Sequence, residues 1–356
     1  MKKNKRHCQN LPELGKIHPE FFNKHIFHKL GAADASVIVK PCHGVDFGVI
    51  SLGNKVMVLS TDPFFIAKEL GIEKAAWFAV HILASDVAVS GIKPRYLSVD
   101  LNLPPQISEE ELARLWGAVH KECKKLGINV VTGHTARYAG CNYPMVGGAT
   151  VFGIDKKDKL IIPKPQPGDA IIVSKGPAIE TTGLMSAYFP QFLAARYGSK
   201  FVKQAQAIFY KMSTVKDALT AAACGGVTAM HDATECGVLG GLFEMAAQAR
   251  VGMDIRLDDI IMPQEVRLTC ECFDIDPFRA ISEGTLLATA KKSKAAKVVR
   301  ALKRSGIEAS ICGKVIPKSK GITVFEKGRH YKLEHPKVDP FWIKFEEYLK
   351  KSRHAG

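Results

Sequence analysis

The stretch VDFGVISLGNKVMVLSTDPF, residues 45–64, holds two apolar runs separated by the dipeptide Gly-Asn. A two-residue turn of this kind predicts a β-hairpin and fixes its register. That register places Asp46 opposite Thr61, with Asp62 next to it, so two carboxylates and a hydroxyl meet at the open end. Strict pairing puts the two carboxylates on opposite faces unless the strands end or bulge there. Such oxygens suit Mg²⁺ with a phosphate; two solvated turn acids are the alternative.

Outward from the hairpin, strand-like and helix-like segments alternate, which predicts an α/β chain whose N-terminal half has α+β character. A segment with three prolines, residues 162–169, divides the chain, and we expect an N-terminal domain at 1–162 and a C-terminal domain at 163–356. Strands are expected at 48–52, 55–60, 95–101, 129–132, 149–154, 170–174, 227–232, 252–256, 284–290 and 309–315. Helices are expected at 75–90, 108–126, 183–195, 200–211, 214–223, 238–249, 264–272 and 295–305.

Composition excludes several classes of protein. Hydrophobic residues make up 46% and charged residues 24% of the 356 residues, a balance typical of a folded chain. There is no apolar run long enough to span a bilayer and no signal-peptide pattern, so we expect a cytoplasmic protein without membrane contact. Nine scattered cysteines predict neither a disulfide framework nor a zinc ribbon. Of the net charge of +15, residues 290–356 carry +12 and residues 1–6 add four, but without an RNA- or DNA-binding motif this favours a solvated surface over nucleic-acid binding.

The helix expected over residues 75–90, AAWFAVHILASDVAVS, is apolar nearly all round and therefore buried, yet it contains Asp86. A buried carboxylate needs a cation, hydrogen-bond donors or a metal ion. A salt bridge to Lys93 or Arg95 is the alternative to a metal site. His81 of the same helix is interpreted as a packed core residue rather than a ligand.

Two further strands end in polar residues. One ends in Gly-His134-Thr135; the other ends at Asp232 and is followed by Thr234 and by Gly237, which opens a helix. Strand ends that lead into helix N-termini bind anions in α/β folds, because free amides and the helix dipole point there. Helix capping alone is the alternative explanation for Asp232 and Thr234.

Taken together, these motifs resemble the PurM-like, or AIR synthase-related, superfamily, and within it the hydrogenase maturation HypE family. VDFGVISL with VLSTDPF is similar to the family's first hairpin, AVHILASDVAVSGIKP to its acidic helix, and VVTGHT to its glycine-acid-threonine loop. In the second half PGDAIIVSKG, HDATECGVLGGLFEMA and FDIDPFRAISEGTLLATA match three further motifs in the family's order.

The resemblance implies a homodimer whose N-terminal domains pair into a β-barrel, with ATP and Mg²⁺, or Mn²⁺ as the alternative ion, held by acidic residues. It implies metal ligation by Asp46, Asp62 and Asp86, and catalytic roles for Asp86, His134 and Asp232. Nucleotide contacts would come from Asp46, Thr61, Asp62, Thr135, Thr234 and Gly237.

Three departures from the family pattern limit what the resemblance implies. His134 stands where the family has Asp or Glu, and neutral imidazole is a poor Mg²⁺ ligand. Ser85 replaces the usual Asn before Asp86. The HypE family ends in a cysteine that carries a carbamoyl group, whereas this chain ends KKSRHAG and its last cysteine, Cys312, lies in an expected strand. Carrier chemistry on the chain's own tail is therefore not expected.

We therefore expect an ATP-dependent ligase or phosphotransferase that activates an oxygen of a small molecule or of a protein-borne group by phosphorylation. The first alternative is a HypE-type maturation factor acting on a partner's thiol. The second is an ATP-binding regulator without turnover, which the histidine at position 134 makes plausible.

Overall fold

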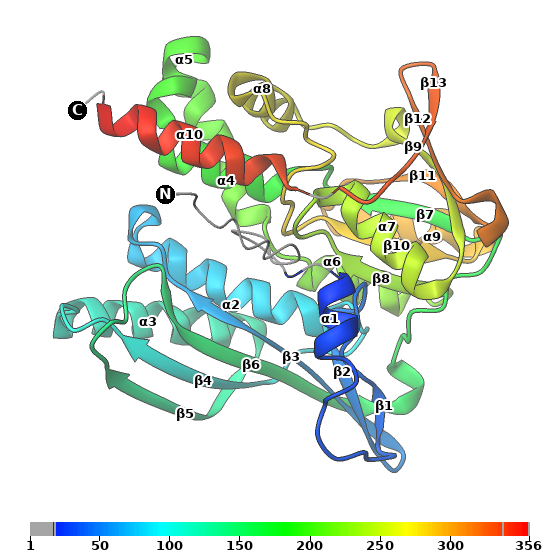
Figure 1. The fold of residues 1–356 in the computed structure, drawn as a ribbon, viewed down its shortest axis with the longest axis horizontal. Helices are drawn as coiled ribbons and strands as arrows, with labels where there is room; N and C mark the ends of the chain where they lie inside the picture. Colours follow the sequence, from blue (N-terminus) through cyan, green and yellow to red (C-terminus); the bar gives the residue numbers. More distant parts are fainter. Residues whose placement is uncertain (1–16, 18, 337, 355–356) are drawn as a thin grey trace, which may run out of the picture.

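The computed structural model describes residues 17, 19–336 and 338–354, so the basic cluster expected at residues 1–6 lies outside the described residues. The chain forms two sheets, each with its own helices (Figure 1). The domain boundary expected after residue 162 falls in the segment between the two sheets.

The N-terminal sheet has six strands in the order β1-β2-β3-β6-β4-β5, antiparallel except for the parallel pair β4 and β5. Its elements are α1 (Pro19–His25), β1 (Val37–Val39), β2 (Gly48–Leu52), β3 (Lys55–Phe65), η1 (Lys68–Leu70), α2 (Ile72–Ala88), β4 (Tyr96–Leu103), α3 (Glu109–Leu126), β5 (Asn129–Arg137), β6 (Met145–Lys156) and η2 (Lys157–Lys159).

The hairpin register predicted from the sequence is confirmed, with Gly48 paired to Leu59 and Leu52 to Lys55. β2 begins only at Gly48, so Asp46 precedes the strand and escapes the strict alternation of faces. β3 runs on to Phe65, beyond the expected end, because β6 pairs with it along nearly its whole length.

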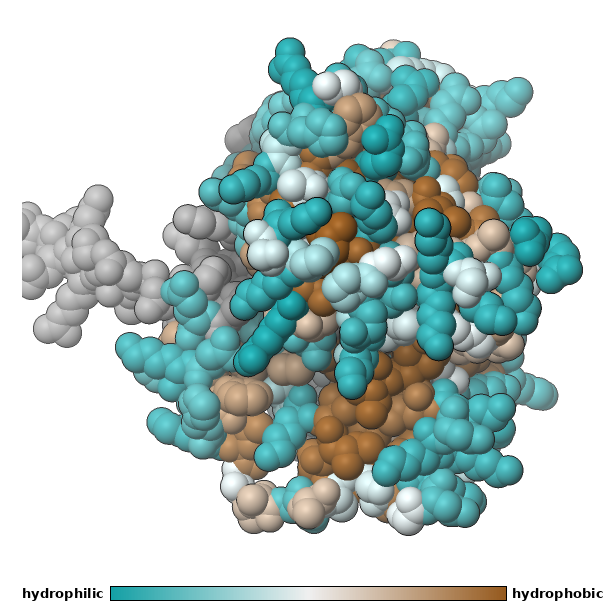
Figure 2. Space-filling view, turned by 90° about the vertical axis from the view of Figure 1, so that its right-hand side faces the viewer, coloured by the Kyte–Doolittle hydropathy of each residue, from teal (hydrophilic) through white to brown (hydrophobic). Residues whose placement is uncertain are grey.

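One face of this sheet is covered by α2 and α3. Val56, Val58 and Phe64 of β3 point into that covered face and are fully buried. The opposite face, which we call the open face, carries half-buried apolar side chains: Ile50, Met57, Leu59, Phe152 and Ile154. Figure 2 shows apolar surface gathered in the lower half of the molecule, at the level of the N-terminal sheet.

The C-terminal sheet has seven strands in the order β13-β12-β9-β11-β7-β10-β8. The elements of this domain are β7 (Ala170–Ser174), α4 (Ile179–Tyr188), α5 (Pro190–Ala207), η3 (Ile208–Lys211), α6 (Val215–Ala223), β8 (Val227–Asp232), α7 (Gly237–Ala249), β9 (Gly252–Arg256), η4 (Leu257–Asp259), α8 (Gln264–Phe273), β10 (Leu286–Ala290), α9 (Lys292–Arg304), β11 (Ala309–Ile316), η5 (Lys318–Lys320), β12 (Ile322–Glu326), β13 (Arg329–Lys332) and α10 (Pro340–His354).

Two regions of the C-terminal domain differ from the sequence expectation. The helix expected over 183–195 is divided between α4 and α5, since Pro190 cannot continue the hydrogen bonding of the preceding helix. Strands β12 and β13 and helix α10 were not expected at all.

The two domains share an apolar interface. Trp77 and Phe78 of α2 pack against Phe209 of η3, and the buried cluster around them runs without a break into both domains. No helix among the described residues combines the length and the apolar character needed to cross a bilayer.

Candidate functional site

Asp86 is the centre of the site. It lies near the C-terminal end of α2 and is 8% exposed, as its place on an apolar helix predicts. Ser60 of β3 donates a hydrogen bond from its hydroxyl to Oδ2 of Asp86 at 2.6 Å. Burial raises the pKa of the Asp86 carboxyl well above its usual range, and the neighbouring carboxylates of Asp232, Asp62 and Asp46 raise it further.

The alternative of a salt bridge to Asp86 is not what the structure shows. The ammonium of Lys93 lies beside Gly127, at the end of α3. The charged groups that act on Asp86 are the three carboxylates, with Asp62 also hydrogen-bonded to it. A buried carboxyl is thus surrounded by groups of its own charge, which is unfavourable unless protons or a cation neutralise them.

Asp46, which lies just before β2, joins this group and also contacts the C-terminal domain. Its carboxylate forms an ion pair with His231 of β8, with Oδ1 2.7 Å from Nδ1. Glu244 of α7 lies on the other side of the imidazole, 3.6 Å from Nε2. Burial lowers the pKa of His231, but the carboxylates of Asp46 and Glu244 outweigh it and raise the pKa to about 9. His231 is therefore a buried cation that links the two domains.

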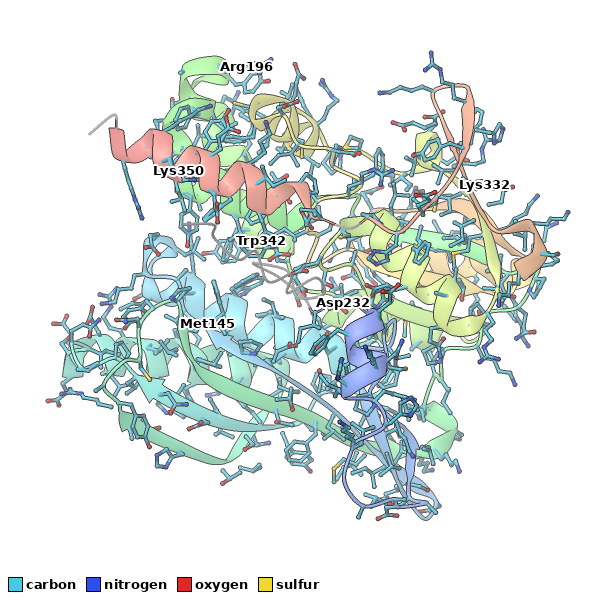
Figure 3. All side chains as sticks on the ribbon, in the orientation of Figure 1. Met145, Arg196, Asp232, Lys332, Trp342 and Lys350 are labelled. Atoms are coloured by element: carbon cyan, nitrogen blue, oxygen red, sulfur yellow. The ribbon has the colours of Figure 1, made fainter. Side chains whose placement is uncertain are left out.

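Asp232, the last residue of β8, completes the cluster from the C-terminal side and is fully buried. Figure 3 labels it where the two domains meet. Ligand atoms of Asp46, His231 and Asp232 all lie within 4.8 Å of one another. The structure thus brings together Asp46, Asp62, Asp86 and Asp232, four of the residues that the sequence singled out.

The turn after β8 leads into α7. The carbonyl of Thr234 accepts hydrogen bonds from the amides of Gly237 and Ser282. Gly237 has a φ of +59°, and a Cβ there would lie 2.4 Å from the carbonyl oxygen of Ala280, so only glycine fits this approach. The close approach explains why a glycine opens the helix.

The amide of Cys236, at the N-terminus of α7, is hydrogen-bonded to another residue of the same chain. Asp339, just before α10, accepts a hydrogen bond from the amide of Cys236 at 2.6 Å and another from the amide of Phe341 at 2.8 Å. The anion position that the sequence predicts at the start of α7 is thus filled here by the carboxyl group of Asp339.

Three residues predicted for the site are not part of the acidic cluster in a single chain. Thr61 points to the open face, where its Oγ1 is 2.8 Å from that of Thr150. His134 and Thr135 lie on β5, at the edge of the sheet, separated from β3 by β4 and β6. Nε2 of His134 is 3.0 Å from the hydroxyl of Tyr138.

Several residues of the site were not predicted from the sequence: Ser60, His231, Glu244, Glu283 and Asp339. His231 precedes Asp232 in the same strand, and that neighbourhood is the only signal for it. Glu283 follows Ser282 in the loop that contacts Thr234, and its amide donates to Oε2 of Glu180 at 3.1 Å. A buried pair of glutamates therefore lies behind the β8–α7 turn.

The chemistry of the donors fits a divalent cation. Four carboxylates offer hard oxygen ligands, which Mg²⁺ and Mn²⁺ accept, and the imidazolium of His231 balances one of their negative charges. A cation held by Asp46, Asp62 and Asp86 would relieve their repulsion and would leave coordination positions for phosphate oxygens.

An apolar cavity of about 500 Å³ adjoins the cluster. Asp46, Ser60 and Thr61 line one side of it. The rest of the wall is mainly hydrophobic and includes Phe22, Val37, Val39, Val49, Ile50 and Leu59. Apolar walls beside a few polar groups are typical of small-molecule sites, and this volume lies within their usual range.

Comparison with known proteins places the chain in a family. Residues 44–155 match the N-terminal domain of AIR synthase related proteins, and residues 166–326 match the C-terminal domain. The carbamoyl dehydratase HypE of Rhizobium leguminosarum bv. viciae is 28% identical over 290 residues, which cover 77% of each protein.

Two solved structures share the fold. The crystal structure of E. coli HypE, a hydrogenase maturation protein, superposes with a TM-score of 0.68 at 25% identity and covers 80% of this chain and 87% of that one. A HypE structure in complex with ATP gives a TM-score of 0.64 at 19% identity, over 90% and 93% of the two chains. With both halves matched in order and the two-domain fold in common, the chain belongs to the PurM-like superfamily of AIR synthase-related proteins.

Proposed function

We propose that the protein binds ATP with Mg²⁺, or Mn²⁺, at the acidic cluster and transfers the γ-phosphoryl group to an oxygen of a small molecule or of a protein-borne group. The observation that carries this proposal is the environment of Asp86, where three further carboxylates surround a buried carboxyl. Phosphoryl transfer needs little beyond positioning and neutralisation of charge on the phosphates, and a cation in this cluster supplies both.

In this arrangement the apolar cavity beside Asp46 accepts the base of the nucleotide, because a flat aromatic ring suits its apolar wall. The phosphates then extend towards Asp62 and Asp86, and Asp232 approaches them from the C-terminal domain. His231 holds Asp46 in place and lowers the net negative charge that the phosphates meet.

One similar protein supports nucleotide binding, and another suggests a second candidate function. A protein of the same fold has been solved with ATP, and a relative 28% identical is a carbamoyl dehydratase. The second candidate function is therefore a HypE-type reaction on the thiol of a partner protein. Co-purification of a carbamoyl-transferase-like partner would favour this reading over a small-molecule substrate.

The test of nucleotide binding is thermal unfolding with ATP and either metal ion. A ligand that binds only the folded protein adds about 2.7 kcal/mol at a hundredfold excess over Kd, which raises Tm by several degrees. Release of ADP from ATP in the presence of candidate amides, carboxamides or phosphosugars as phosphoryl acceptors then distinguishes an enzyme from a regulator. Absence of a Tm shift at millimolar ATP with both ions would refute the proposal.

A further inference from the structure

A second cavity, of about 620 Å³, lies between the domains and shares no lining residue with the acidic cluster. The N-terminal domain contributes Trp77 and His81 from α2 and Glu122 and Lys125 from α3. The C-terminal domain contributes residues of η3, the start of α6 and the end of β7. Any molecule that fills this cavity therefore contacts both domains.

The buried wall of the cavity holds polar atoms that lack hydrogen bonds. His81 is 8% exposed and is stacked on Trp77, with 4.1 Å between the ring centroids. Its Nδ1 lies 2.9 Å from the hydroxyl of Ser213. Its Nε2 lies 3.5 Å from Oε2 of Glu122, and neither of these two atoms has a hydrogen bond among the described residues. Buried polar atoms of this kind are usually satisfied by water or by a ligand.

Four lysines line the cavity against three acidic residues, Glu122, Asp217 and Glu308. Lys175 is paired with Asp217 at 3.0 Å, and Lys125 with Glu122 at 2.7 Å. Lys216 instead donates to the carbonyl oxygen of Ser305 at 2.6 Å.

Lys211 also lines the cavity. Burial lowers the pKa of Lys175 and the carboxylate of Asp217 raises it, while the nearby charge of Lys211 lowers it by a smaller amount, so Lys211 lies close to a second ammonium group. Because Asp217 already pairs with Lys175 at 3.0 Å, an anion bound in the cavity would neutralise the charge of Lys211.

An aromatic surface completes the wall. Tyr210 is 55% exposed and stands edge-on to Trp77 at 5.4 Å between centroids. Such a ring offers a contact for a planar group in a ligand.

We propose that this cavity binds a small metabolite that carries an oxyanion, a phosphate or a carboxylate, on a planar ring. The oxyanion accepts hydrogen bonds from Lys211 and Lys216, the ring packs against Tyr210, and a polar substituent reaches Nε2 of His81. Because the walls come from both domains, the bound ligand bridges them. The site is separate from the proposed ATP site and does not depend on it.

Calorimetric titration with three probes tests the proposal: phenyl phosphate, benzoate and inorganic phosphate. We expect phenyl phosphate or benzoate to bind more tightly than inorganic phosphate, and the order of the two aromatic probes identifies the oxyanion. Binding should also change the fluorescence of Trp77, which lies in the wall. If none of the probes binds at millimolar concentration, or if inorganic phosphate binds as tightly as both aromatic probes, the proposal is wrong.

Substitutions of the cavity lysines test whether the aromatic probe binds in this cavity. Lys211→Gln and Lys216→Gln should each weaken the aromatic probe about tenfold or more, because each removes a charge-assisted hydrogen bond. Lys200→Gln and Lys203→Gln, exposed on α5 and outside the cavity, are the matched controls and should leave the affinity unchanged. Equal affinity in all four variants, or displacement of the probe by ATP with Mg²⁺, would place it elsewhere and overturn the assignment.

Discussion

Asp46 and His231 are 185 residues apart in the chain, yet their side chains meet at 2.7 Å and join the two domains beside the acidic cluster. Both side chains are almost fully buried, so each charge depends on the other. We expect His231→Gln to destabilise the metal-free protein by about 3–5 kcal/mol, since it leaves Asp46 without its partner.

A double-mutant cycle measures the coupling energy between Asp46 and His231. Asp46→Asn combined with His231→Gln should recover part of the loss, with a coupling energy of about 1–3 kcal/mol from urea unfolding. Strictly additive effects of the two substitutions would show that the pair does not hold the domains together.

The carboxyl of Asp339 predicts a dependence of stability on pH. Burial raises its pKa to about 7, against the lowering effect of the hydrogen bonds from Phe341 and Cys236. Between about pH 4 and pH 7 the unfolded chain loses this proton while the folded protein keeps it, so stability falls as the pH rises through that range. The free energy of unfolding falls by about 2–4 kcal/mol in total, and the decrease ends once the pH exceeds the pKa of Asp339 in the folded protein.

Asp339→Asn should remove this component, because an amide does not ionise but can still accept a hydrogen bond. The measurement is urea unfolding of both proteins at several pH values, with exposed Asp158→Asn as the control. The variant should gain stability relative to the wild type as the pH rises towards 7. Parallel curves for the two proteins would contradict the pKa assigned to Asp339.

Local pattern was enough to predict much of the fold. The Gly-Asn turn fixed the hairpin register, and the bounds of β2, β7, β8 and β9 agree with the sequence expectation. Glycine, charged or turn-forming residues flank these segments, and such residues mark the ends of strands in a sequence. The burial of Asp86 also followed from the apolar helix around it.

What the sequence could not predict depends on tertiary contacts. No local signal pairs His231 with Asp46, because only the packing of β8 against the hairpin brings them together. Helix α10 packs Phe345 and Tyr348 against Phe189, the residue between α4 and α5, and its sequence alone does not identify that partner. Val131 is apolar yet 51% exposed on edge strand β5, because no further strand among the described residues of this chain pairs with that edge.

Substitutions that neutralise single carboxylates of the acidic cluster should abolish ATP binding without unfolding the protein. We expect Asp62→Asn and Asp86→Asn to keep the fold, with unchanged or higher Tm in the absence of ligand, since each substitution removes repulsion between carboxylates. Both should lose the Tm shift that ATP and Mg²⁺ cause in the wild type. Asp158→Asn, an exposed substitution in the same domain, should retain it. An unfolded Asp86→Asn would instead show that this carboxyl has a structural role.

The open face of the N-terminal sheet predicts the assembly. Ile50, Met57, Leu59, Phe152 and Ile154 form an apolar surface there, and edge strand β5 leaves backbone groups available for pairing. Pairing two such sheets into a barrel would cover both features, as the family resemblance implies. It would also bring β5 of one protomer, with His134 and Thr135, to the proposed nucleotide site of its partner and would account for their distance from Asp86 within one chain.

We therefore expect light scattering to return about 78 kDa, twice the 38.9 kDa of the chain. Ile154→Lys puts a charge into the middle of the open face and should yield a folded monomer with weakened ATP binding, because burying an unpaired ammonium costs several kcal/mol. Ile311→Lys, the same change at an exposed position of β11 in the other domain, is the matched control and should remain a dimer. A wild-type protein that stays at 39 kDa at micromolar concentration would exclude the dimer, and an Ile154→Lys variant that stays dimeric would place the interface on another surface.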